Sequence, residues 1–272
     1  MREITDVREV QAILNAALVY FADFCENNGL RYFLANGTLI GAVKYEKFVP
    51  WDDDVDILMP RNDYQKLLEL TSVSNGTYRL LSKQTTPTWK MPYAKLTDSR
   101  TLLQEGDFDF GVELGVSLDI FPIDNWFSNQ TMASVQAIYS DVLKRMLICS
   151  NGGEFHTEKR GIQKAILYSI WWLGKKLGCE RIYQLIQKNA AAVKESSYCG
   201  CVAWTCHAQH EVLPNEVFAS CEKRTFCGRE YPIPCGYERY LDQLYGRWRE
   251  ELPLEKQKSN HVIKVWQKDE RI

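Results

Sequence analysis

The sequence predicts an α+β fold in which helices flank a mixed β-sheet and a largely helical insertion or subdomain follows the core. Three observations lead to this prediction. Residues 1–125 alternate helix-spaced and strand-like segments, residues 130 to about 195 are helical in pattern, and strand and helix patterns return after residue 225. We therefore expect a core over 1–125, a mainly helical unit over 126–224, and a C-terminal segment over 225–272 that packs back on the core.

The elements of the core follow in order along the chain. Apolar residues from Val7 to Phe24 recur at helical spacing, and Gly29 provides a stop for that helix. A short strand is expected at 30–35 and a helix from Leu39 onward. The remaining core elements are a helix over 61–72 and strands at 77–83, 91–97, 101–105 and 117–121. The C-terminal segment is expected to hold a hairpin or strand at 225–233 and a helix from Gly236 to Trp248.

The most distinctive motif is an acidic run, Asp52, Asp53, Asp54 and Asp56, which leads into an apolar strand. Alternate residues of a strand face the same way, so Asp54 and Asp56 are expected to project together. Carboxylates this close repel one another unless a cation neutralises them, and oxygen ligands suit magnesium. An acidic loop that only leads into a strand is the other interpretation.

An anion site is predicted just upstream of the acidic run. Gly37 and Thr38 join the strand at 30–35 to the next helix, where free N–H groups and the helix dipole favour negative charge. An ordinary strand–turn–helix corner is the alternative. Lys44 and Lys95 are candidates to neutralise a diphosphate, with Arg100 as a weaker third, although each also fits a solvated surface cation.

Asp119 lies between apolar residues on the predicted strand 117–121. A buried carboxylate without a partner is costly, so a cation or a hydrogen-bond donor is expected beside it. If this strand neighbours the acidic one, Asp54, Asp56 and Asp119 converge on one metal position. A cap or salt bridge at the strand end is the alternative.

The combined motifs resemble the nucleotidyltransferase superfamily. The run 35–44 followed by 48–56 is similar to the LicD family, which includes bacterial phosphocholine transferases and is related to the fukutin-type phosphotransferases. The segment 119–124 fits the same pattern, as do Tyr245-Gly246, Leu252-Pro253 and His261. The resemblance covers residues 10–125 and 225–262. The chain departs from the family at Lys47, where glycine is usual, and at Pro253-Leu254, where a proline pair is usual.

The resemblance implies a nucleotidyltransferase-type fold and a donor, CDP-choline, from which phosphocholine moves to a hydroxyl of a cell-surface glycan precursor while CMP leaves. The acceptor would be of teichoic acid or lipopolysaccharide type and lipid-linked. Asp54, Asp56 and Asp119 would hold Mg²⁺ or Mn²⁺, and Asp52 or Asp53 would serve as base or support the metal ligands. The donor phosphates would be bound by Gly37, Thr38, Lys44 and Lys95. Aromatic faces suit a trimethylammonium group, and the available residues are Trp51, Trp89, Tyr93, Trp126 and Trp204.

Two other functions stay open at this point. The same scaffold serves enzymes that move ribitol phosphate, glycerol phosphate or a nucleotidyl group. A protein that binds nucleotide or glycan without catalysis is also compatible, although all three predicted metal ligands are present.

Composition limits the class of protein. A chain of 272 residues with 45% hydrophobic content can bury a substantial core. A net charge of −2 speaks against a nucleic-acid binder, which needs a basic excess. The polar N-terminus has no secretion signal and no apolar run reaches the ~18 residues of a membrane span, so we expect a cytoplasmic protein.

Two further segments allow more than one interpretation. Residues 162–177 are apolar, contain Trp171 and Trp172, and have basic residues at both ends. This pattern fits a buried helix of the helical unit, which the sequence slightly favours, or a helix in contact with the inner leaflet of the membrane. Six of the nine cysteines fall between 199 and 235 near His207 and His210. Their spacing lacks paired Cys-x-x-Cys motifs, so free thiols are expected rather than zinc.

Overall fold

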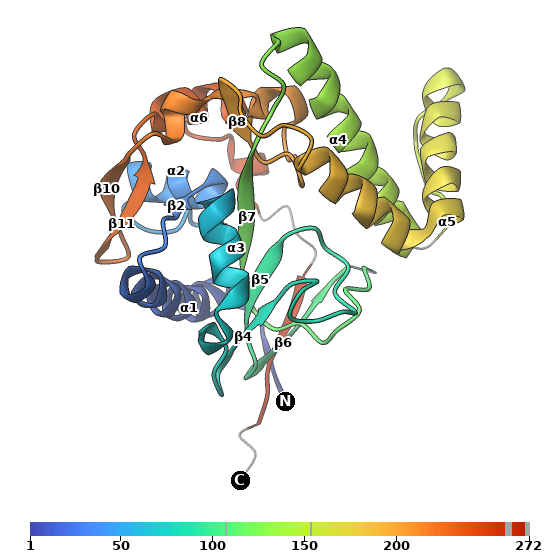
Figure 1. The fold of residues 1–272 in the computed structure, drawn as a ribbon. Helices are drawn as coiled ribbons and strands as arrows, with labels where there is room; N and C mark the ends of the chain where they lie inside the picture. The colour runs from blue at the N-terminus through green and yellow to red at the C-terminus, as the bar shows by residue number, and fades with distance from the viewer. Residues whose placement is uncertain (107, 153, 259–262, 270–272) are drawn as a thin grey trace.

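The computed structural model describes residues 1–106, 108–152, 154–258 and 263–269. Its centre is a mixed sheet with the order β2-β3-β7-β5-β4, as Figure 1 shows in part. The strands are β2 (Phe33–Leu34), β3 (Val55–Pro60), β7 (Ser117–Asn125), β5 (Ala94–Asp98) and β4 (Tyr78–Leu81). Strands β3 and β7 are parallel, whereas the other neighbours are antiparallel. The predicted α+β fold with a mixed sheet is confirmed.

Three helices pack around this sheet: α1 (Val7–Asn28), α2 (Asn36–Lys44) and α3 (Arg61–Glu69). Helix α1 begins where the Asp6 carboxylate accepts the Arg8 N–H, and it ends at Gly29, whose φ of 63° suits glycine. Its buried stripe faces β5 and β7, while α3 lies on β3 and β7. Helix α2 begins at Asn36, three residues before the predicted start, so Gly37 and Thr38 belong to its first turn.

The part of the chain with the helical pattern holds two long helices, α4 (Gln130–Asn151) and α5 (Gly161–Ala190). Gly178 has φ 76° and ψ 162°, so α5 is two helical stretches that meet at a break. The interpretation of residues 162–177 as a buried helix is wrong. In the stretch 161–177 only Gly174 is buried, because this half of α5 projects from the molecule beside α4 (Figure 1).

Short elements tie the helical unit to the core. Strand β8 (Tyr198–Gly200) pairs with β7 and with β9 (Leu213–Pro214). The 3₁₀ turns are η1 (Thr71–Val73), η2 (Ala208–Glu211), η3 (Asn215–Phe218) and η4 (Leu254–Lys256). Because β8 pairs with the last residues of β7, Asp124 and Asn125, the chain after the two helices is hydrogen-bonded to the central sheet.

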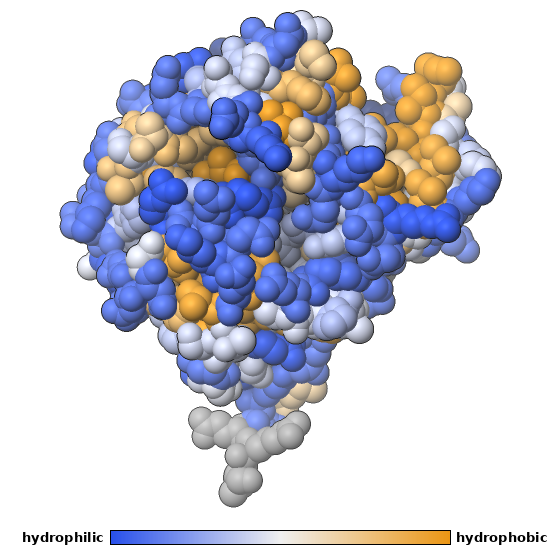
Figure 2. Space-filling view, viewed as in Figure 1, coloured by the Kyte–Doolittle hydropathy of each residue, from blue (hydrophilic) through white to orange (hydrophobic). Residues whose placement is uncertain are grey.

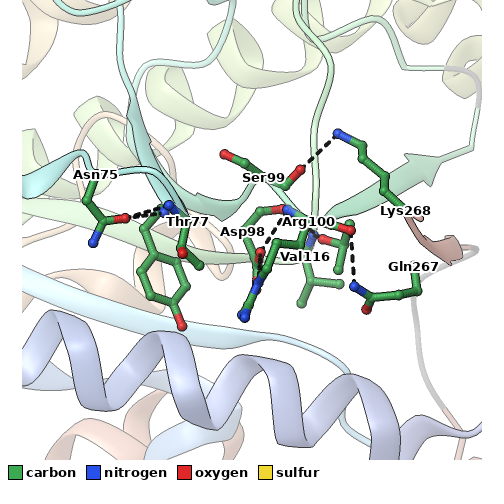
Figure 3. A network of polar contacts seen from close by, with 10 residues as sticks. Asn75, Thr77, Asp98, Ser99, Arg100, Val116, Gln267 and Lys268 are labelled. Carbon is green, nitrogen blue, oxygen red and sulfur yellow. Dashed lines mark hydrogen bonds and ion pairs between the residues drawn. The ribbon is translucent and has the colours of Figure 1, made fainter. Parts of the chain in front are cut away.

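A second, three-stranded sheet joins β1 (Arg2–Ile4), β12 (Ile263–Gln267) and β6 (Thr101–Glu105). The sequence predicted only β6 of these strands. A tight turn after β5 directs the chain into this sheet. In it the buried Asp98 carboxylate accepts hydrogen bonds from the Arg100 backbone N–H at 2.9 Å, from its Nε at 3.0 Å and from its Nη2 at 2.6 Å (Figure 3). Lys268 Nζ donates to the Ser99 carbonyl at 3.0 Å, which links this turn to the chain after β12.

The C-terminal segment contains a hairpin of β10 (Cys221–Phe226) and β11 (Arg229–Pro234), followed by α6 (Tyr237–Tyr245). The hairpin contacts β2 and α2 of the core. A side chain on Gly41 of α2 would lie 3.2 Å from the Phe226 ring and 2.6 Å from the Lys47 carbonyl, so glycine permits this close approach. The predicted boundary at 224/225 falls within β10. In the described part of the chain, no helix is both long and apolar enough to cross a bilayer.

Candidate active site

The parallel pairing of β3 and β7 places Asp56 directly opposite Asp119. Strand β5 pairs on the other side of β7, where Lys95 lies opposite Asp119. Neighbouring strands are about 4.8 Å apart, so this register brings two carboxylates and one ammonium group together in the middle of the sheet. The two acidic strands are neighbours, which is the condition on which the convergence of the three carboxylates depended.

These side chains line a cavity of about 960 Å³. All five predicted aspartates contribute to its wall: Asp52, Asp53, Asp54, Asp56 and Asp119. Gly37, Lys44 and Lys95 also line it, whereas Thr38 does not. The core therefore brings a strongly acidic group and two lysines to one cavity.

Asp56 lies close to other carboxylates. Burial raises its pKa well above the usual value, and the nearby Asp54 and Asp119 raise it further. A hydrogen bond from the Asn36 side chain opposes this shift. A cation in the cavity would neutralise the same charge, because an ionised carboxylate that is buried among others is costly.

Lys95 and Asp119 form a buried ion pair, with Lys95 Nζ donating to Asp119 Oδ1. Burial acts to lower the pKa of Lys95, but the attraction of Asp119 and Glu105 outweighs it and the pKa is raised. The lysine therefore stays charged and holds the Asp119 carboxylate in place.

Thr38 is hydrogen-bonded to the strand that carries Asp56. Its hydroxyl is buried and accepts the Asp56 backbone N–H at 3.0 Å. The preceding Asn36 has a left-handed backbone with φ 46°, and its Oδ1 accepts a hydrogen bond from Tyr240 Oη at 2.6 Å. Asn36 thus links the C-terminal segment to the acidic strand. Its left-handed conformation, which Asn tolerates better than most residues, was not foreseen from the sequence.

Gly37 gives Asp52 room at the first turn of α2. A side chain built on Gly37 would place its Cβ 2.6 Å from Asp52 Oδ2, closer than ordinary contact allows. The N-terminus of a helix favours negative charge, so the acidic run and the predicted anion site lie against one another.

Asp52, Asp53 and Asp54 meet the geometric requirement for a metal ion, since one carboxylate oxygen from each lies within 4.8 Å of the others. No other group of three such side chains in the described ranges does so. Oxygen donors of this kind suit Mg²⁺ or Mn²⁺. The residues therefore fit a divalent cation, and Asp54 belongs both to this cluster and to the predicted set of Asp54, Asp56 and Asp119.

Lys44, the last residue of α2, lines the cavity. Its ammonium group donates to the Glu250 carbonyl at 2.8 Å and lies 3.0 Å from a Glu251 carboxylate oxygen. Burial acts to lower its pKa, but the bonds to Glu251 and Tyr45 raise it. Arg100, the third candidate for phosphate, pairs with Asp98 and does not line the cavity.

Comparison with known proteins identifies the domain that builds this wall. Residues 29–142 match the family model of the LicD/FKTN/FKRP nucleotidyltransferase domain. The chain is also 27% identical over 289 aligned residues to the lipopolysaccharide cholinephosphotransferase LicD of Haemophilus influenzae. The alignment covers 98% of this chain and 99% of that protein. Residues 29–142 thus form a LicD-type domain, and the similarity to the Haemophilus influenzae protein extends over nearly the whole chain. The prediction of this family is confirmed, and with it the expectation that the protein is an enzyme of the phosphotransferase class.

A second relative shares only part of the LicD domain. Mannosyltransferase regulator 4 of Saccharomyces cerevisiae is 39% identical over 86 residues, which is 28% of this chain and 7% of that protein.

Other residues of the cavity lie beyond the LicD domain and were not foreseen as site residues. They include Lys144, Cys206, His207 and Tyr245. The His207 and Tyr245 rings meet edge to face with centroids 4.8 Å apart. Burial lowers the pKa of His207, and the nearby His210 and Lys144 lower it further. Tyr245 belongs to the C-terminal resemblance, and Cys206 and His207 belong to the late cysteine and histidine group, but neither signal placed them in this cavity. They reach the LicD domain only through the packing of distant segments.

Glu211 fixes the loop that carries Cys206 and His207. Its Oε1 accepts the backbone N–H of both, with 2.6 Å to His207. Burial raises the pKa of Glu211 to about 7, although these two hydrogen bonds act to lower it. The carboxyl group is thus a buried support of the cavity wall.

Aromatic side chains cover much of the remaining wall of the LicD site. Of the candidates for a choline pocket, Trp51, Tyr93 and Trp204 line the cavity. Trp89 and Trp126 do not, because both are fully buried in the core. The Tyr93 ring lies 5.4 Å from that of Trp204, measured between centroids.

The late cysteines show no metal-binding arrangement. All nine cysteines of the chain are free thiols, and in the ranges that the structure describes none belongs to a group with metal-ligand spacing. His261, part of the C-terminal resemblance, lies outside the described residues.

Proposed function

We propose that this protein transfers phosphocholine from CDP-choline to a hydroxyl of a cell-surface glycan precursor and releases CMP. One observation carries the proposal: five aspartates, two lysines and several aromatic rings share the wall of one cavity. Phosphoryl transfer needs positioning and charge neutralisation more than covalent chemistry, and this wall provides both.

A divalent cation is the second part of the proposal. Asp54, Asp56 and Asp119 are the ligands that the motif predicts, and Asp52 and Asp53 lie close enough to Asp54 to complete the set. A cation held there would supply positive charge to the donor diphosphate and to the leaving nucleotide phosphate.

The side chains of the chain would then divide the remaining tasks. The acceptor oxygen forms a bond to the phosphorus of phosphocholine, and the bond from that phosphorus to the bridging oxygen of the diphosphate breaks. Asp52 or Asp53 takes the proton of the acceptor hydroxyl. Lys95 holds Asp119 in place, and Lys44 presents positive charge at the cavity edge.

The aromatic rings support choline as the transferred group. A quaternary ammonium is attracted to aromatic faces and cannot donate a hydrogen bond. Trp204 already has the Lys144 ammonium 4.9 Å above its ring centroid, which shows that the site tolerates a cation against this wall. We infer that Trp51, Tyr93 and Trp204 are the rings that the choline headgroup meets.

The acceptor class in this proposal is supported by one relative and by the family resemblance. The Haemophilus influenzae protein is by its name a lipopolysaccharide cholinephosphotransferase. We propose a lipopolysaccharide-type or teichoic-acid-type precursor that is lipid-linked and is modified on the cytoplasmic side of the membrane.

The donor is tested by comparing CDP-choline, CDP-ribitol, CDP-glycerol and nucleoside triphosphates with magnesium present. We expect CDP-choline to raise the melting temperature most and CDP alone to raise it less, since a ligand that binds only the native state stabilises it. A shift with CDP-ribitol or CDP-glycerol and none with CDP-choline would move the assignment to another phospho-alcohol.

The acidic site is tested by Asp56→Asn, with Asp23→Asn on α1 as the control. Asp23 is an aspartate outside the cavity. We expect Asp56→Asn to abolish transfer without lowering the melting temperature, because it removes a buried carboxylate that its neighbours repel. EDTA should abolish the transfer activity of the wild type, and added magnesium or manganese should restore that activity. More than a few per cent of residual transfer in Asp56→Asn contradicts the proposed metal set.

A further inference from the structure

The N-terminal half of α5, residues 161–177, is a largely solvent-exposed apolar helix. Ile162, Ile166 and Trp172 expose 75%, 53% and 46% of their surface. Figure 2 shows this apolar surface on the helix at the upper right, the same helix that stands apart in Figure 1. Soluble proteins rarely leave so many large apolar side chains of one element in water, so we expect this face of the helix to be covered by a binding partner.

The helix has an inner and an outer side. Its inner side meets α4 at Gly174, where a Cβ atom would lie 2.6 Å from the Met146 carbonyl. Tyr168 and Trp171 pack against Phe155 in the segment before the helix, with ring centroids 5.4 and 6.0 Å away. The outer stripe, which includes Ile162, Ile166, Trp172 and Leu173, is left without contacts of this kind.

The charged residues within this stretch are all of one sign. Between residues 159 and 179 there is no aspartate or glutamate. The basic residues of this stretch are Lys159, Arg160, Lys164, Lys175 and Lys176. Lys176 lies 4.9 Å above the Trp172 ring, so an aromatic ring and a positive charge share one end of the stripe.

We propose that this helix docks on an anionic lipid bilayer and lies in its interface. An apolar stripe with tryptophan and basic residues at its borders fits the boundary between acyl chains and headgroups. With 17 residues in the stretch and ~1.5 Å per residue the helix is about 25 Å long, shorter than a bilayer core. A second copy of this chain is a poorer occupant, because both ends of the helix are basic and would repel in either orientation.

The docked helix would bring the bilayer to the edge of the catalytic cavity. Lys175 Nζ donates to the carbonyl of Gly152, and Gly152 lines the cavity. Ile148 of α4 lines it too and is 40% exposed. Helix α4 therefore has one end in the cavity wall and packs against the proposed membrane helix.

Vesicle flotation tests the proposal without an activity assay. We expect the wild type to float with phosphatidylcholine–phosphatidylglycerol vesicles, to float less with phosphatidylcholine alone, and to be released by salt. Ile166→Ser/Trp172→Ser should lose binding. The matched control is Val135→Ser/Ile138→Ser on α4, whose side chains are 62% and 48% exposed and which should float as the wild type does.

A second pair of variants tests the charges. Arg160→Gln/Lys164→Gln should bind about 25-fold more weakly, at about fivefold per positive charge near an anionic surface. Lys66→Gln/Lys223→Gln removes two exposed lysines elsewhere and should bind as the wild type does. These substitutions lie in solvent, so this pair decides the question if the apolar variant fails to fold.

Three results would overturn the proposal. The wild type could stay in the lipid-free fraction with anionic vesicles at low salt. The α4 control could lose as much binding as the α5 variant. Light scattering could instead show a dimer that Ile166→Ser/Trp172→Ser abolishes, in which case the helix is an interface between copies of this chain.

Discussion

Glu211→Gln isolates the contribution of one buried carboxyl group to stability. Burial raises the pKa of Glu211 from 4.5 to about 7. The folded protein therefore holds this proton more tightly than the unfolded chain does. The stabilisation is complete below about pH 4.5 and is lost as the pH rises through 7. At ~1.4 kcal/mol per pKa unit, the loss is about 3 kcal/mol.

Glutamine removes the titration and keeps an oxygen that accepts the Cys206 and His207 N–H groups. We expect the free energy of unfolding of the variant, minus that of the wild type, to rise by about 3 kcal/mol between pH 4.5 and pH 7.5. Urea unfolding at a series of pH values measures it, with Glu230→Gln on β11 as an exposed control. A difference that stays constant across this range would refute the assignment of Glu211 as a carboxyl group that burial keeps protonated.

Two further predictions concern the acidic wall. Gly37→Ala should lower transfer by up to about 100-fold, because Asp52 has to move by roughly 0.8 Å to clear the new methyl group; steady-state kinetics measure it, and Gly76→Ala, where a Cβ meets nothing within 4 Å, should leave activity unchanged. Equal activity in both variants would argue against a role for Asp52. Thr38→Val leaves the Asp56 N–H without its acceptor and should cost about 1–3 kcal/mol in denaturant unfolding, while Thr38→Ser should recover most of it.

The local features of this protein could be predicted from its sequence. Helix α1, the acidic strand β3 and the helical pattern from residue 130 to about 195 were predicted because residue periodicity and capping residues act over a few positions. The LicD family was recognisable for a similar reason, since its motifs are continuous runs of residues around Gly37 and the acidic segment. Strands β1 and β12 were missed, because each is short and pairs with a strand far away in the sequence.

The composition of the site depended on the tertiary structure. The pairing of Lys95 with Asp119 follows from the order of β5 and β7 in the sheet, which no local pattern encodes. His207 and Tyr245 enter the cavity only because distant segments pack against the LicD domain. The N-terminal half of α5 shows the same limit: its sequence is apolar on several sides, and whether those side chains meet protein or solvent is decided by what packs beside them. Periodicity determines which residues share a helix or strand, whereas burial and pairing are properties of the assembled chain.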